Sequence, residues 1–161
     1  MSRFVWLPIV LMLGPLTCGP AAKYSGPRPP KPDIPYLVHA DNLIETEVAE
    51  ANEEDRRNEV AAWVSGASSP VRTPLAEPIF LIEAGKIAPE KFELFRFEVR
   101  SGRRQVTIPK RGARGGTKPL RLVVTQLEPK LYRLEVNEFL ENGEYSLSPS
   151  GSNQAFCFQV Y

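Results

Sequence analysis

The sequence is poor in the residues that most catalytic and metal sites require. It contains one histidine, His39, and two cysteines, Cys18 and Cys157, in 161 residues. A zinc site needs three or four N, S or O ligands, and a catalytic triad needs a serine and an acid beside its histidine. The sequence also shows no nucleophile-elbow glycine pattern, phosphate-binding loop or dinucleotide fingerprint. It therefore predicts no metal, no cofactor and no enzymatic activity.

The chain also lacks an excess of either charge. The 20 Lys and Arg side chains and 19 Asp and Glu side chains give a net charge of +1, and without Arg3 the two kinds balance. Such a chain has no global field that would attract it to a polyanion. We expect no nucleic-acid binding, and any electrostatic function must be local.

No apolar run is long enough for a membrane-spanning helix, which needs about 20 residues. The apolar stretch 4–16 is interrupted by Pro8 and Pro15, follows Arg3, and precedes the small residues Gly19 and Ala21. This order is typical of a signal peptide, here residues 1–22. The prediction is an exported protein with no transmembrane span in its mature part.

Cys18 offers an alternative to soluble export, because a thiol at the end of a leader can carry a lipid anchor. The preceding residues 15–17, Pro-Leu-Thr, fit a lipidation signal poorly. Soluble export is favoured, and lipidation of Cys18 stays the alternative.

Six prolines lie between residues 20 and 35. Proline-rich chain forms a semi-rigid extended spacer, so residues 23–35 are predicted to be a linker and residues 36–161 a single domain. If Cys18 leaves with the leader, Cys157 cannot form an internal disulfide. Its position between Phe156 and Phe158 predicts a buried core residue.

Alternation of apolar and polar residues dominates the domain and predicts strands. The alternation at 95–99, the Ser101-Gly102 turn and the alternation at 104–108 indicate a hairpin. The run at 79–82 is continuously apolar, as in a strand buried on both faces. Further predicted strands lie near residues 36–38, 60–64, 120–124, 132–136, 145–147 and 156–160. From these nine candidate segments we predict an all-β sandwich of seven to eight strands.

The segment 45–59 is ambiguous. Its Glu and Ala content favours a helix, but apolar residues flank a polar centre at 52–55, as in a long hairpin. The hairpin is the favoured prediction, and both forms would be largely exposed to solvent.

The residues Leu140, Gly143 and Tyr145 form a Leu-x-x-Gly-x-Tyr pattern between two predicted strands. The pattern resembles the tyrosine corner of immunoglobulin-like Greek-key sandwiches, with Asn142 in place of the usual proline. The ending from Gly143 to Phe158 is similar to the tails of uncharacterised exported bacterial proteins. The resemblance implies strands E, F and G of such a sandwich and a backbone hydrogen bond from the Tyr145 hydroxyl. It carries no catalytic residue and leaves the function open.

Charge is unevenly divided along the chain. Residues 100–121 carry eight cations and no acid, and residues 41–59 carry eight acids and two cations. The basic region predicts a binding site for an acidic protein or an anionic envelope polymer, and the alternative is pairing with the acidic segment or simple solvation. The predicted binding residues are Arg103, Arg104, Lys110, Arg111, Arg114 and Lys118.

These observations favour a non-enzymatic binding or assembly module of the cell envelope. One alternative is a carboxylate-dependent hydrolase acting on envelope carbohydrate, which needs two carboxylates in a cleft, one of them with a raised pKa. Another is self-assembly through opposite charges or an open strand edge. The candidate carboxylates are Asp41, Glu45, Glu77, Glu83 and Glu90.

Overall fold

The computed structural model describes residues 23–110 and 115–161. The predicted signal peptide, the lipidation candidate Cys18, and Arg111 and Arg114 lie outside these residues. No helix among the described residues is long and apolar enough to span a membrane. The described chain is almost entirely β, with one 3-10 turn, η1 (Pro89–Lys91). Its strands are β1 (Tyr36–His39), β2 (Asn42–Glu45), β3 (Glu47–Glu50), β4 (Asn52–Asp55), β5 (Glu59–Ser65), β6 (Arg72–Thr73), β7 (Ile79–Glu83), β8 (Phe92–Arg100), β9 (Arg103–Pro109), β10 (Leu122–Glu128), β11 (Leu131–Val136), β12 (Gly143–Pro149) and β13 (Gln154–Val160).

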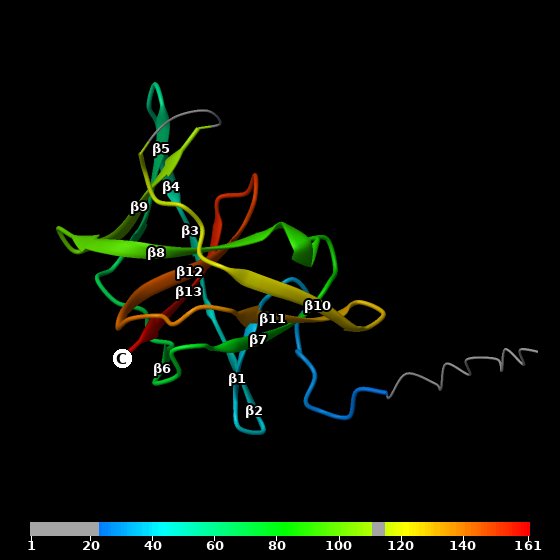
Figure 1. The fold of residues 1–161 in the computed structure, drawn as a ribbon. Coiled ribbons are helices and arrows are strands. Elements are labelled where there is room, and N and C mark those ends of the chain that lie inside the picture. The colour runs from blue at the N-terminus through cyan, green and yellow to red at the C-terminus, as the bar shows by residue number, and fades with distance from the viewer. Residues whose placement is uncertain (1–22, 111–114) are drawn as a thin grey trace, which may run out of the picture.

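Two sheets pack face to face, which confirms the predicted all-β sandwich. One has the order β10-β11-β7-β1-β2, and the other has the order β3-β13-β12-β8-β9-β5-β4, with β6 beside β13. Figure 1 shows the β1–β2 and β4–β5 hairpins projecting at opposite ends of the molecule. The chain forms more strands than the seven to eight expected because the polar segments 42–55 and 72–73 also pair.

The main core lies between the sheets and consists of aromatic and branched aliphatic side chains. The Phe80 and Phe158 rings, one from each sheet, lie 5.0 Å apart between centroids. As predicted, β7 is buried on both faces. The core residues are Leu37, Phe80, Ile82, Phe92, Leu94, Leu134, Val136, Leu140, Tyr145, Leu147, Phe156, Phe158 and Val160.

The strand order supports the predicted positions of the last three strands. β10-β11-β7-β1 corresponds to D-E-B-A of an immunoglobulin-like sandwich, and β13-β12-β8-β9 corresponds to G-F-C-C′. The hydroxyl of Tyr145, a residue of β12, donates a hydrogen bond at 2.7 Å to the carbonyl of Glu141 in the loop between β11 and β12. Leu140 is buried beside it, and Gly143 begins β12. The expected backbone bond of a tyrosine corner is thus present.

The second sheet curls until its two outer strands meet. β3 pairs with β13 and β4 pairs with β5, yet β3 and β4 are consecutive and only Ala51 separates them. The stretch 47–55 therefore occupies both edges of the sheet and closes it around a second core. That core contains Ala62, Val64, Phe95, Phe97, Val106, Ala155 and Cys157.

Cys157 belongs to this second core, as its flanking phenylalanines predicted. The side chain is fully buried, and burial raises the pKa of its thiol to about 12. Because the thiolate is the reactive form of cysteine, this position suits packing and not nucleophilic chemistry.

Arg104 crosses the interior of the curled sheet. Its side chain is 1% exposed, and it donates two hydrogen bonds to the Glu47 carboxylate at 2.6 and 2.8 Å. It also donates to the carbonyls of Ser65 and Gly66. Glu144 lies 3.8 Å from the same guanidinium, so the cation joins β9 to β3, β12 and the loop after β5. The prediction that Arg104 is a surface binding residue is wrong.

The acidic segment 45–59 forms no helix. Residues 52–55 pair with 60–63 in the β4–β5 hairpin, which confirms the favoured prediction for that part. Leu43 and Ile44, expected to flank this hairpin, instead pair with Val38 and Leu37 of β1.

The proline-rich stretch lies against the domain and does not extend away from it. Pro29 is buried, and Arg28 pairs with Glu128. The Asp33 carboxylate accepts hydrogen bonds of 2.8 to 2.9 Å from the backbone N–H groups of residues 85–87. This composition predicted a spacer, but residues 28–33 pack on the ends of the first sheet.

We predict that Arg104→Met lowers the free energy of unfolding by roughly 3 to 5 kcal/mol, because it leaves the buried Glu144 and the partly buried Glu47 without their cation. Arg103→Met is the matched control, since its side chain is exposed and should cost about 0.5 kcal/mol or less. Urea unfolding of both variants measures the difference.

The pH dependence checks the cause of this loss. Burial opposes ionisation of Glu47, but hydrogen bonds from Arg104 and Ser69 and the Arg104 charge outweigh burial and lower its pKa below 4.5. The stabilisation is therefore present above pH 4.5 and is lost as the pH falls through the lowered pKa. Without Arg104, burial favours the neutral acid, so the loss caused by Arg104→Met should shrink in acid. A loss that is independent of pH would contradict this electrostatic cause.

Candidate functional site

The structure divides the predicted basic site among several environments. Arg104 is buried, and the Lys110 ammonium lies 2.5 Å from the Asp55 carboxylate of the acidic hairpin. Arg103 and Lys118 are exposed. The predicted single basic loop is therefore not formed by the described residues.

The acidic and basic segments meet within the second sheet. The order β4-β5-β9 places an acidic strand two positions from a basic one, and Lys110–Asp55 and Arg104–Glu47 are ion pairs between the two segments. At these two points the intramolecular pairing considered from the sequence is present. The described cations of the basic region that form no ion pair with a carboxylate are Arg100, Arg103, Lys118 and Arg121.

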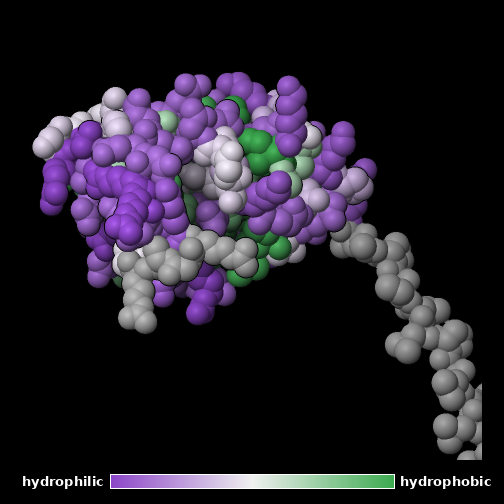
Figure 2. Space-filling model, turned by 90° about the horizontal axis from the view of Figure 1, so that it is seen from above, coloured by the Kyte–Doolittle hydropathy of each residue, from purple (hydrophilic) through white to green (hydrophobic). Residues whose placement is uncertain are grey.

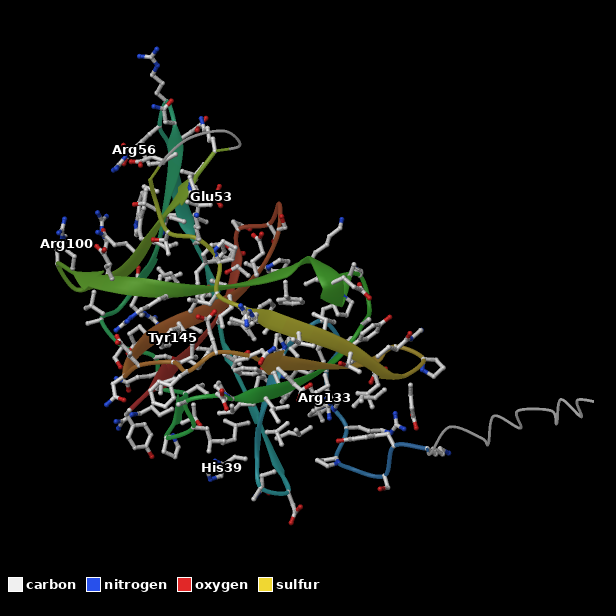
Figure 3. The ribbon with its side chains drawn as sticks, in the orientation of Figure 1. His39, Glu53, Arg56, Arg100, Arg133 and Tyr145 are labelled. Carbon is white, nitrogen blue, oxygen red and sulfur yellow. The ribbon has the colours of Figure 1, made fainter. Side chains whose placement is uncertain are left out.

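Two of these cations lie at the turn of the β8–β9 hairpin. Arg100 and Arg103 are directly opposite each other in register, on either side of the turn at Ser101 and Gly102. Both turn residues have positive φ, 52° and 73°, as a two-residue type I′ turn requires. Figure 3 shows Arg100 at the outer end of β8, where the hairpin projects from the second sheet.

This arrangement of like charges is unfavourable. Directly opposed side chains have Cβ atoms about 5 Å apart, and like charges at that position repel. Among the residues described, no carboxylate lies within 4.0 Å of either guanidinium. Within the described chain, the fold thus places two cations together without an ion pair to either. Glu54 nevertheless lines a cavity with Arg103, and its pKa is lowered mainly by Arg56 and in part by the Arg103 charge.

Trp63 contacts one of the two guanidiniums, that of Arg103. The Arg103 guanidinium carbon lies 4.8 Å from the indole centroid, in range for a cation–π interaction. Trp63 is opposite Gln105 in register, and Gln105 is opposite Glu98. Because directly opposed residues share a face, these side chains lie with Arg103 on the outer surface. We call this surface, formed by Trp63, Glu98, Arg100, Arg103 and Gln105, the arginine–tryptophan face.

A shallow cavity adjoins this face. It has a volume of about 590 Å³, and Glu98, Val99, Arg100 and Thr117 are among its lining residues. The segment after residue 114 folds back over β9, where the Thr117 N–H donates to the Thr107 carbonyl at 2.6 Å. Lys118 therefore follows directly after a residue of the cavity wall. Figure 2 shows a largely hydrophilic surface seen from above, broken by smaller hydrophobic areas.

Trp63 was not predicted to be a surface residue. Its position was predictable, because Ala62 and Val64 point into the second core and alternation directs Trp63 outward. Its partnership with Arg103 was not predictable, because it depends on the pairing of β5 with β9.

The candidate carboxylates of a hydrolase are distributed over several elements. Asp41 lies in the β1–β2 turn, Glu83 ends β7, and Glu90 lies in η1. Glu77 lines a cavity with Glu135, which was not among the five candidates. Hydrogen bonds from Lys31 and Tyr36 lower the pKa of Glu45, the opposite of the raised pKa that a general acid needs.

His39, the one histidine, is exposed at the end of β1, as a strand-end residue would be. It is labelled near the β1–β2 hairpin in Figure 3. The described residues contain no group of three or more His, Cys, Asp or Glu side chains suited to a metal ion.

No family model, no curated protein and no solved structure matches the chain.

The repulsion between Arg100 and Arg103 gives a stability prediction. Arg100→Glu should raise the free energy of unfolding by about 0.5 to 1 kcal/mol, because it replaces a like pair with an opposite pair. Arg96→Glu on the same strand is the control and should lower it, since Arg96 already pairs with Glu141 at 2.6 Å. Thermal or urea unfolding at low salt measures both changes. A loss of stability in Arg100→Glu would show that the two arginines do not repel.

Proposed function

We propose that the protein is an exported, non-enzymatic binding module that recognises an anionic polymer of the cell envelope through the arginine–tryptophan face. The observation that carries the proposal is the pair of opposed cations, Arg100 and Arg103, neither of which forms an ion pair with a carboxylate among the described residues. An anion placed between two guanidiniums would remove their repulsion and accept charge-assisted hydrogen bonds from both. Export is supported by the leader pattern in residues 1–22.

The neighbouring side chains suit a polymer better than a single ion. The Arg103 guanidinium lies over the Trp63 ring, and a cation–π contact of this kind leaves N–H donors of the guanidinium free for a ligand. Gln105, Glu98 and Thr117 add amide, carboxylate and hydroxyl groups that can bond to sugar hydroxyls. Lys118 extends the positive charge beyond the hairpin.

Retention on an immobilised sulfated polysaccharide, heparin, tests the proposal. The native chain should be retained on heparin and not on neutral dextran. The triple variant Arg100→Glu, Arg103→Glu, Lys118→Glu should bind at least about tenfold more weakly, because each lost contact to a charged group is worth about 1.5 kcal/mol or more.

A matched control distinguishes binding at the arginine–tryptophan face from attraction by the net charge of the chain. Lys23→Glu, Arg57→Glu, Lys86→Glu changes three exposed cations elsewhere and alters the net charge equally. Near-native retention of this control supports the arginine–tryptophan face. Equal loss in both triple variants, or no retention of the native chain, would contradict the proposal, and retention only on immobilised polyglutamate would assign the face to acidic proteins.

A further inference from the structure

The curled sheet has a second open end that is distinct from the arginine–tryptophan face. Arg104 fills one end of its interior, near the end of β5 and the start of β9. At the opposite end of these strands lies a cavity of about 360 Å³, which we call the mouth. The β4–β5 hairpin and the β12–β13 turn lie toward the same end of the molecule in Figure 1.

The inner part of the mouth is apolar and includes Phe95, Val60 and Ile108. Phe95 belongs to the second core, and Ile108 packs against it. This surface continues the packed interior and offers contact to a hydrocarbon chain. A small concave site with an apolar floor and a few polar groups is the usual form of a ligand pocket, and barrel mouths are common places for one.

The polar part of the mouth carries negative charge. Glu93 precedes Phe95 by two residues and so shares its inward face, and Glu53 is opposite Ala62, another second-core residue. The turn from Ser148 to Asn153 completes the wall with hydroxyl and backbone groups. The described lining residues include two carboxylates and no Lys or Arg.

Glu53 and Glu93 differ from the neighbouring acidic residues, which form ion pairs with basic side chains of the same chain. Arg56 pairs with Glu54 and Glu59, and Lys110 pairs with Asp55. Within the described part of the chain, Glu53 and Glu93 form no such pair. Glu93 is half-buried, and a partly desolvated carboxylate is stabilised by a nearby cation.

We propose that the mouth binds a small aliphatic amine. The ammonium group lies at the carboxylates of Glu53 and Glu93, and the hydrocarbon chain lies on Phe95, Val60 and Ile108. An ammonium has three donors, which the carboxylates and the serine hydroxyls can accept. A bare metal ion would leave the apolar floor unused, and an anionic ligand would meet two like charges.

Titration of the full chain with hexylamine, followed by NMR of its backbone amides, tests this site. Hexanol and hexanoate have the same chain length with a neutral and an anionic head. Hexylamine should shift the amides of residues 150–153 and 93–95 with a dissociation constant of about 1 mM, a reasonable affinity for seven non-hydrogen atoms. Hexanol should bind at least about fivefold more weakly, and hexanoate should not bind.

The variant Glu53→Gln, Glu93→Gln should weaken hexylamine binding about tenfold or more, because it removes both charged acceptors. Asp41→Asn, Glu77→Gln changes the net charge equally at exposed positions outside the mouth and should bind as the native chain does. The preference for hexylamine over hexanol is measured on the native chain and does not depend on either variant folding.

Three results would overturn the proposal: equal binding of hexylamine and hexanoate, unchanged hexylamine binding in the Glu53→Gln, Glu93→Gln variant, or shifts confined to residues outside the mouth. Binding of a lysine-rich peptide without binding of hexylamine would also overturn it, because the site would then recognise a protein partner.

Discussion

The ion pair between Arg104 and Glu47 is the interaction on which the second half of the molecule depends. The second core contains mostly alanine, valine and one cysteine beside Phe95 and Phe97, so it is smaller than the core between the sheets. A buried guanidinium can occupy such an interior only if its donors are satisfied. The carboxylate of Glu47 and the carbonyls of Ser65 and Gly66 meet this requirement.

Closure of the sheet also explains the positions of the two proposed sites. Because 47–55 joins both edges of the sheet, the β4–β5 hairpin is held beside β9, and Trp63 is held beside Arg103. The same closure places Glu53 of β4 at one cavity with Glu93 of β8. The arginine–tryptophan face carries cations on the outside of the curled sheet, whereas the mouth is lined by carboxylates at the open end of the sheet.

The sequence predicted the parts of the fold that alternation or unbroken apolarity marks. The β8–β9 hairpin, the buried strand around Cys157 and the hydrogen bond from the Tyr145 hydroxyl to nearby backbone were all predicted from local patterns, and the structure contains them. β3 and β4 were harder to predict because few of their side chains are apolar, and their pairing depends on distant strands. The packing of residues 28–33 on the domain depends on Glu128 and the 85–87 backbone, which no local pattern indicates.

The binding residues were predicted less well, because a count of charges does not distinguish the two faces of a strand. Arg103 and Arg104 contributed equally to the charge of the basic region, yet alternation places Arg104 on the inward face with Val106. If the charges had been counted for each face of the strand separately, Arg103 and Arg104 would have been assigned to opposite faces. The pairing of Lys110 with Asp55 required the pairing of β4, β5 and β9, which is a tertiary property.

A double-mutant cycle on Arg104 and Glu47 tests the central claim most directly. The free energies of unfolding of the native chain, Arg104→Met, Glu47→Gln and the double variant give the coupling between the two side chains. A buried, bidentate pair that holds the curled sheet closed should couple by about 2 kcal/mol or more. A value of about 0.5 kcal/mol, typical of an exposed pair such as Arg96 and Glu141, would contradict the account.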